Sequence, residues 1–184
     1  MNPILVEAMR GDARESAHRG AVIVVDADGH RVAALGDVER LVFPRSAVKV
    51  LQAIPLVESG AAERLALDDE ELAIACASHN GEPEHVAVVE RLLAKAGLDA
   101  SALECGTHWP RVEPVAYAIA AAGREPTALH NNCSGKHAGF LCLACMLCDG
   151  VNLRQYAKGY VLPRHPVMRA VTEVLQAATA STPR

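Results

Sequence analysis

Runs of apolar residues divide the chain into a short β-rich start and a longer helical part. The β-branched run 21–25 and the apolar run 31–35 flank the segment Asp26-Ala-Asp-Gly29. The glycine that closes this segment tolerates the positive φ that a tight turn imposes. Residues 21–35 are therefore predicted to form a β-hairpin.

Helical patterns follow from residue 46 onward. A helix over 46–59 is predicted to end at Gly60, and Pro55 is expected to bend it from within. The segment Asp68–Glu71 has the pattern of a capping box, in which an acidic side chain satisfies free amides at a helix start. Further predicted helices cover residues 72–77, 83–97, 113–122, 140–148 and 167–178.

This order of elements predicts a mixed α+β fold. One hairpin is a small sheet for so many helices, and an isolated two-stranded sheet is marginally stable in water. Either further strands lie in segments without a clear pattern, or the chain is incomplete at its C-terminal end.

The composition is that of a globular protein. Of the 184 residues, 51% are hydrophobic, 22% are charged and 3% are aromatic. The 18 basic and 22 acidic residues give a net charge of −4, which argues against a nucleic-acid partner, because no excess of cations would neutralise phosphates. We expect one domain over residues 1–184.

The chain carries no sign of a membrane or secretory segment. No run approaches the roughly 18–20 uninterrupted apolar residues that a membrane helix needs. Glu7 lies where a signal peptide would be apolar. We therefore expect a cytoplasmic protein without a membrane partner, whose cysteines are thiols.

Three of the six cysteines, Cys142, Cys145 and Cys148, repeat the spacing of metal-binding cysteines. The residues between them are Leu, Ala and Met, and 140–148 is apolar on every side, which is typical of a buried helix. On a helix, residues at +3 and +6 drift around the cylinder and do not converge on one ion. Buried thiols are the favoured interpretation over a zinc or iron–sulfur site.

The segment Phe43-Pro-Arg-Ser-Ala-Val-Lys49 contains a Ser-x-x-Lys pattern. On a helix Ser46 and Lys49 would share a face, so a desolvated lysine could act as base for the serine. The alternative is a helix-capping serine beside a solvated lysine, and the pattern alone does not decide between them.

The segment Cys76-Ala-Ser-His-Asn-Gly-Glu-Pro83 follows an apolar run and precedes a helix that starts at proline. Ser78, His79 and Asn80 are thus expected in a tight loop between packed elements, where functional side chains are common. A turn in which Ser and Asn satisfy local backbone groups is an equal alternative.

The segment His130-Asn-Asn-Cys-Ser-Gly-Lys-His137 precedes the apolar helix. A phosphate-binding loop is excluded, because His130 replaces the required glycine and His137 the required Ser or Thr. We interpret the segment as a strand-to-helix turn that presents Cys133, Lys136 and His137 at a helix N-terminus, where backbone amides favour an anionic group. A purely structural turn is the alternative.

Taken together, the segments 43–49, 77–85 and 131–140 resemble, in order and approximate spacing, the bacterial L-asparaginase II family of the thermolabile, rhizobial type. The opening segment 3–7 and the late segment 162–166 fit the same family, so the resemblance covers nearly the whole chain. It implies an amidohydrolase that converts L-asparagine to L-aspartate and ammonia. It also implies the fold of serine β-lactamases and penicillin-binding proteins, an antiparallel sheet flanked by helices.

The resemblance also implies a set of site residues. A serine of each of the first two motifs would face the other, each with a lysine partner, and a zinc ion would lie nearby. Which serine is the nucleophile stays open, as does the role of zinc, which is expected to organise or polarise the site. The expected catalytic residues are Ser46, Lys49 and Ser78; the substrate-binding residues are Arg45, His79, Asn80 and His137; the zinc ligands are Cys133 and Lys136.

Members of this family are longer than this chain. Their third zinc ligand, in an Asp-Gly-Cys motif, and the lysine partner of the second serine would lie past Arg184, and Met168 stands where a glutamine is expected. We therefore expect a single domain truncated at its C-terminal end, which would expose apolar surface and self-associate, for example as a homodimer. An inactive, truncated relative is one alternative function, and a β-lactamase-like serine acylase of other specificity is another.

Overall fold

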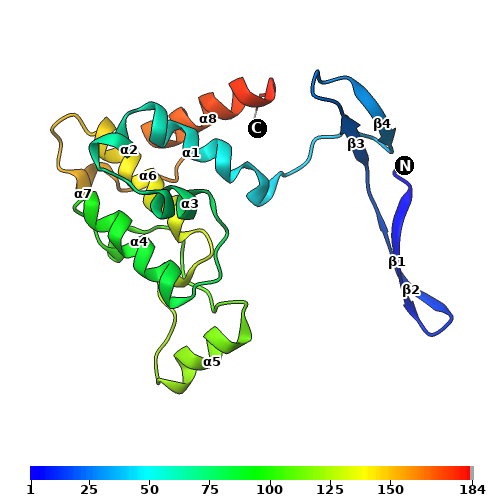
Figure 1. Ribbon diagram of the computed structural model, residues 1–184, viewed down its shortest axis with the longest axis horizontal. Helices are drawn as coiled ribbons and strands as arrows, with labels where there is room; N and C mark the ends of the chain where they lie inside the picture. Colours follow the sequence, from blue (N-terminus) through cyan, green and yellow to red (C-terminus); the bar gives the residue numbers. More distant parts are fainter. Residues whose placement is uncertain (183–184) are drawn as a thin grey trace. The chain divides into compact units, whose positions relative to one another are not determined.

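The computed structural model describes residues 1–182, and its chain divides into two compact units, Met1–Phe43 and Pro44–Arg184. The first unit contains strands only, and the second contains helices (Figure 1).

The first unit consists of two antiparallel hairpins. Strands β1 (Ile4–Arg10) and β2 (Ala13–Arg19) form one sheet, and β3 (Val22–Val25) and β4 (Arg31–Leu35) form the other. The predicted hairpin over 21–35 is confirmed, with Gly29 at a φ of +82° in its turn. The mixed α+β class is confirmed as well.

The hairpin β1–β2 was not predicted, because residues 4–19 show no alternation of apolar and polar positions. It is held by its backbone ladder and by cross-strand ion pairs at the surface. Glu7 and Arg14 lie 2.7 Å apart, and Arg10 and Glu15 lie 2.8 Å apart. Further strands thus lie in a segment without a clear hydrophobic pattern. They form a second two-stranded sheet and do not enlarge the first.

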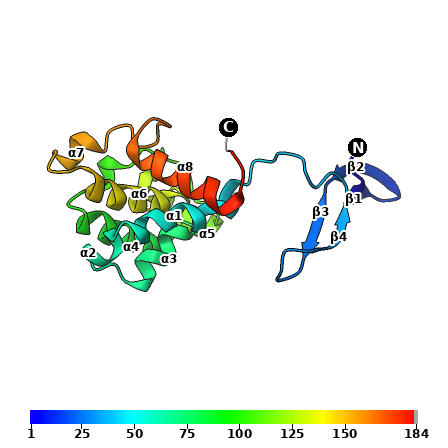
Figure 2. The ribbon, with the colours of Figure 1, turned by 90° about the horizontal axis from the view of Figure 1, so that it is seen from above.

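The second unit is built around one central helix, α6 (Ser134–Leu147). Helices α1, α3, α4 and α8 pack against it or against one another, and the view from above shows α1, α6 and α8 side by side (Figure 2). The α-helices besides α6 are α1 (Lys49–Glu58), α2 (Ala61–Arg64), α3 (Asp69–Cys76), α4 (Pro83–Lys95), α5 (Glu113–Ala121), α7 (Leu153–Tyr156) and α8 (Pro166–Thr179). Short 3₁₀ helices are η1 (Arg45–Val48), η2 (Ala100–Ala102) and η3 (Ala128–His130).

Two local predictions for the helical unit are confirmed. Asp68 and Glu71 form the predicted capping box at the start of α3. Pro83 is the first residue of α4, where its missing N–H costs no helical hydrogen bond. Glu71 is fully buried, and its Oε2 accepts a hydrogen bond from Lys95 of α4 at 2.5 Å, which ties the two helices together.

Two other predictions are corrected. The segment from residue 46 begins as the 3₁₀ helix η1, and the α-helix starts at Lys49. The element before the turn at 131–133 is η3 and not a strand, and α6 begins at Ser134 instead of residue 140. The polar first turns of α6 hid its start, because they break the apolar pattern.

Helix α6 lies unusually close to the end of α3. A Cβ added to Gly135 would lie 2.2 Å from the carbonyl oxygen of Ile74, so only glycine fits there. This contact places the loop that follows α3, residues 77–82, beside the N-terminus of α6.

The cysteine run lies on α6 and at its end, as expected of core thiols. Cys142 is buried, with its Sγ 3.6 Å from the carbonyl oxygen of Leu92, and Cys145 and Cys148 are half-buried. Burial raises the pKa of Cys142 to about 12, so its thiol stays protonated and packs as an apolar group. Within residues 1–182, no helix is long and apolar enough to cross a membrane.

Candidate active site

The three segments singled out in the sequence meet at the side chain of Lys49. Its Nζ donates hydrogen bonds to the carbonyl oxygens of Ala77, at 2.7 Å, and of Asn132, at 3.1 Å. Lys49 is only 3% exposed although it carries an amine. The first residue of α1 therefore holds the loop after α3 and the turn before α6 in one place.

Ser46 lies in η1, three residues before Lys49, and is exposed. Arg45, directly before it, has a φ of +55°, a left-handed backbone that is uncommon for a residue with a Cβ and costs about 1–3 kcal/mol. Within the described residues, the Nζ of Lys49 donates only to the two carbonyl oxygens. A role of Lys49 as base for Ser46 stays a prediction.

Ser78 and Asn80 are exposed at the mouth of a groove of about 710 Å³ between α3 and α4. Charged side chains of both helices, among them Glu84 and Arg91, line the groove as well. The groove can thus offer hydroxyl, amide and ionic contacts to a small polar molecule.

His79, between these two residues, points into the protein and is 5% exposed. Its Nδ1 accepts a hydrogen bond from the N–H of Gly81 at 3.0 Å, and its Nε2 lies 2.8 Å from the Oγ of Ser134. Burial, reinforced by nearby histidines and Lys49, lowers the pKa of His79 to about 4. Both ring nitrogens are engaged within the chain, and substrate binding by His79 stays a prediction.

The turn before α6 is organised by the side-chain amide of Asn131. Its Nδ2 donates to the carbonyl oxygen of Cys105 at 2.8 Å, and its Oδ1 accepts the N–H of Cys133 at 2.8 Å. Cys133 is the half-buried residue directly before α6, and Lys136 lies one turn further along the helix.

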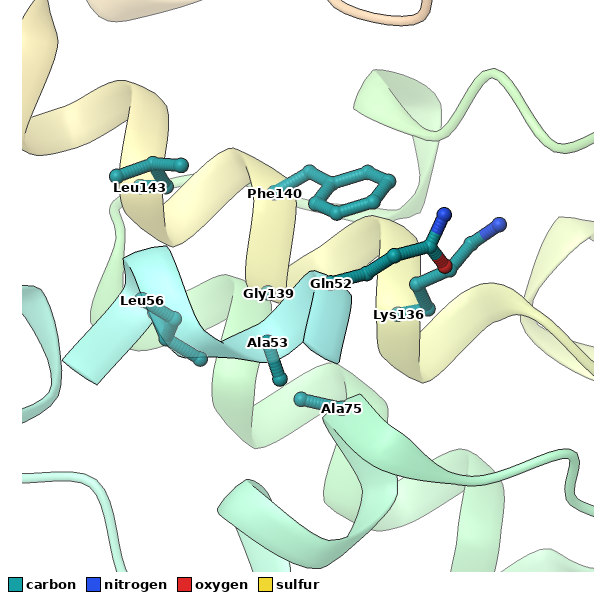
Figure 3. A pocket seen from close by; sticks show the side chains of 8 residues that line it. All are labelled: Gln52, Ala53, Leu56, Ala75, Lys136, Gly139, Phe140 and Leu143. Carbon is teal, nitrogen blue, oxygen red and sulfur yellow. The ribbon is translucent and has the colours of Figure 1, made fainter. Parts of the chain in front are cut away.

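Lys136 lies where α1, α3 and α6 meet. Figure 3 shows Gln52 and Lys136 at the same end of an apolar seam, beside the ring of Phe140. The Nζ of Lys136 is 5.6 Å from the centre of that ring. Burial lowers the pKa of Lys136, which favours the neutral amine.

The residues of this turn fit a zinc ion in their chemistry. A thiol and an amine, Cys133 and Lys136, stand one helical turn apart, and only a neutral amine can bind a metal. A third cysteine, Cys105, is tied to this turn through its carbonyl oxygen, which Asn131 binds, and burial raises the pKa of its thiol to about 11.

A family model for L-asparaginase II matches residues 6–184. The chain belongs to the L-asparaginase II family. The match includes all three segments that meet at Lys49, and it confirms the family resemblance of the motifs. No curated protein matched the chain.

Membership in the L-asparaginase II family suggests an asparaginase-type amidohydrolase, and it implies asparagine as substrate. Of the expected site residues, the structure brings Lys49, the Ser78 loop and the Cys133–Lys136 turn together through hydrogen bonds. Ser46 and Arg45 lie in the turn just before Lys49.

His137 of this asparaginase-family chain has a partner that sequence patterns did not indicate. Its Nδ1 lies 2.7 Å from the hydroxyl of Tyr160, which itself accepts the N–H of Glu104 at 3.0 Å. The Tyr160 hydroxyl can donate to Nδ1 while it accepts from Glu104, an arrangement that leaves the imidazole proton on Nε2. Burial lowers the pKa of His137 to about 3.

The other overlooked residues are Asn131 and Ser134. Both lie in the motif segment 131–140, but no pattern indicated their contacts, since most of their partners lie five to more than fifty residues away. Tyr160 had no signal at all.

Another group able to hold a metal lies in the first unit. Ligand atoms of Asp26, Asp28 and His30 lie within 4.8 Å of one another at the exposed β3–β4 turn. The Oδ1 of Asp26 accepts the N–H groups of Asp28 and His30, so the turn itself accounts for this grouping.

Proposed function

We propose that this chain hydrolyses L-asparagine to L-aspartate and ammonia, with Ser46, Lys49 and Ser78 as catalytic residues. The observation that carries the proposal is the pair of hydrogen bonds from the Nζ of Lys49 to the carbonyl oxygens of Ala77 and Asn132. A buried amine that joins three motif segments of an asparaginase-family chain is placed as a site centre would be.

In the proposed reaction, the Oγ of Ser46 attacks the side-chain amide carbon of asparagine. Lys49, once it has released one of its own protons, takes the proton of Ser46 and passes it to the departing nitrogen, which leaves as ammonia. The ester so formed between Ser46 and the aspartyl group is then cleaved by water, which returns the proton to the serine. Ser78 assists proton transfer or orients the amide.

Substrate contacts are assigned by position and chemistry. Asn80 faces the groove beside Ser78 and can bind the amide or the α-amino group. Arg45, next to Ser46, can pair with the α-carboxylate, for which its planar fork of donors is suited. His137 is only 8% exposed, and because its Nδ1 contacts Tyr160, its Nε2 is the ring nitrogen left to contact the substrate.

A zinc ion would be held by Cys133 and Lys136, and it would supply a positive charge that polarises a substrate carbonyl or orders the turn. Zinc competition with a chromogenic chelator tests this assignment without any activity assay. We expect Cys133→Ser to weaken zinc binding, while Cys148→Ser at the other end of α6 leaves it unchanged. Equal affinity in the two variants would contradict the assignment.

We further propose that this chain has the serine β-lactamase-like fold and a cytoplasmic location. We also propose that it self-associates, because the valines and the isoleucine of the apolar strand β3 are 47–53% exposed. Size-exclusion chromatography tests it, and elution as a sharp monomer would contradict it.

The function is tested by ammonia release from L-asparagine by the purified 184-residue chain. We expect Ser46→Ala and Ser78→Ala each to lower the rate strongly, and Ser16→Ala on the exposed strand β2 to leave it unchanged. If the wild-type chain releases no more ammonia than Ser46→Ala, the chain is an inactive relative. Turnover of a β-lactam in place of asparagine would favour a serine acylase of other specificity.

A further inference from the structure

Both sequence neighbours of Ser78 are held in place by contacts within the helical unit. On one side, Lys49 binds the carbonyl oxygen of Ala77, the peptide group directly before Ser78. On the other side, the ring of His79 is inserted into the protein. An exposed side chain with both neighbours fixed has little backbone freedom, as a catalytic or orienting hydroxyl requires.

The ring of His79 has one hydrogen-bond arrangement that satisfies all its partners. The N–H of Gly81 can only donate, so Nδ1 accepts and carries no proton. The proton is therefore on Nε2, which donates to the Oγ of Ser134, and Ser134 donates its own proton to the carbonyl oxygen of Leu129. This chain of donors connects the Ser78 loop to the first residue of α6.

The surroundings of His79 favour the uncharged ring. Besides being buried, it faces His85 of α4, with ring centres 5.4 Å apart, and it lies near Lys49, His108 and His130. A second proton on the ring would lie against the N–H of Gly81 and would have no acceptor.

The backbone packs tightly at both ends of the same loop. A Cβ on Gly81, whose φ is +72°, would lie 2.9 Å from the carbonyl oxygen of His130. At the other end, the carbonyl of Ile74 approaches Gly135 so closely that no side chain fits. A side chain at either glycine would therefore push the loop away from its neighbours.

We propose that His79, as a neutral ring that donates from Nε2, is a positioning residue that holds Ser78 in register with the N-terminus of α6. The inference rests on the proposed function and deepens it, since it assigns His79 to the loop itself and leaves substrate contact to Asn80. Positioning acts on the reacting geometry more than on binding, so its loss lowers kcat more than it raises KM.

Two conservative variants separate the two hydrogen bonds of the ring. In His79→Gln the side-chain amide can reach Ser134 and donate to it, whereas in His79→Asn the shorter amide reaches only toward Gly81. Because the link to α6 is the one that fixes the register, we expect His79→Gln to keep more kcat than His79→Asn.

A double-mutant cycle measures the link directly. We expect His79→Asn and Ser134→Ala each to lower kcat about 100-fold, with KM within about threefold of wild type. The double variant should lose no more than either single variant, because both remove the same contact. Losses that multiply in the double variant would contradict the link.

His165 provides a matched control, since its ring is engaged in the same way far from the loop in sequence. Its Nδ1 accepts the N–H of Val167 at 3.2 Å, and its Nε2 donates to the carbonyl oxygen of Tyr156 at 2.8 Å. His165→Asn should lower the melting temperature and leave kcat unchanged. If it lowers kcat as much as His79→Asn does, the effect is one of stability and the proposal is wrong.

A second readout does not depend on activity. Nitrogen-15 NMR of the histidine rings should show His79 protonated at Nε2 only at pH 6, and hydrogen exchange should show a protected Gly81 amide that His79→Ala exposes. A charged or Nδ1-protonated ring, or equal exchange in both proteins, would overturn the positioning role. Absence of ammonia release from the wild-type chain would overturn the proposed function alone.

Discussion

Residues 1–43 and residues 44–182 are stabilised in different ways. None of the first 43 residues is buried, and their hairpins rest on ladder hydrogen bonds and exposed ion pairs. The helical unit buries an apolar core together with six polar side chains, of which Lys49, His79, Ser134 and His137 belong to the candidate site. Polar groups out of water must be paired, so their positions are fixed by their partners.

This difference explains why the candidate chemistry lies in the helical unit. A group held by buried hydrogen bonds keeps its orientation before substrate arrives, whereas a side chain on an exposed hairpin must be ordered at each encounter. Asp26, Asp28 and His30 are grouped closely enough for an ion, yet they have no buried partner.

The largest effect should come from removing the buried amine. Lys49→Met leaves the carbonyl oxygens of Ala77 and Asn132 without a donor, which should lower the free energy of unfolding by about 3 kcal/mol or more. Urea denaturation measures it. The exposed Lys158→Met serves as control and should change little; equal effects would show that Lys49 does not tie the segments together.

Acid should destabilise the helical unit next most strongly. The pKa of His79 is about 4 in the folded chain and 6.5 for an unperturbed histidine, so between these values the unfolded chain binds a proton that the folded one does not. Stability therefore falls as pH drops from about 6.5 to 4, by about 3 kcal/mol at the lower end.

Unfolding measured at several pH values in wild type and His79→Gln tests this window. Because glutamine does not titrate, the variant should lose less stability over the same range. Parallel curves for the two proteins would mean that His79 does not titrate with folding.

The smallest effect is expected in the first unit. A double-mutant cycle of Glu7→Ala and Arg14→Ala should give a coupling of less than about 1 kcal/mol, since both side chains are about half exposed. The coupling should shrink further in 1 M salt. A larger, salt-resistant value would mean that the hairpin is held by more than its ladder.

The sequence predicted the helices and strands that are determined by residues close together in the chain. The apolar runs around Asp28-Gly29 predicted β3–β4, the Asp68–Glu71 capping box predicted the start of α3, and Pro83 marked the start of α4. It did not predict β1–β2, whose residues lack alternation, since their pairing is visible only in the ladder.

The candidate site likewise has residues that local motifs indicated and partners that they did not. Ser46, Lys49, Ser78, Cys133 and Lys136 were found from motifs and family resemblance. Their partners were not, because Lys49 meets Asn132 over 83 positions and His79 meets Ser134 over 55, and no local pattern encodes contacts at such separations.

The central claim is that Lys49 and the segments it joins form an asparaginase site with Ser46 as nucleophile. Acid quenching of the chain during turnover of L-asparagine, followed by peptide mass mapping, tests this most directly. We predict an aspartyl adduct on the peptide that contains Ser46, lost in Ser46→Ala and retained in Ser16→Ala. An adduct on Ser78 would contradict the assignment of the nucleophile, and the absence of both adduct and ammonia would contradict the account as a whole.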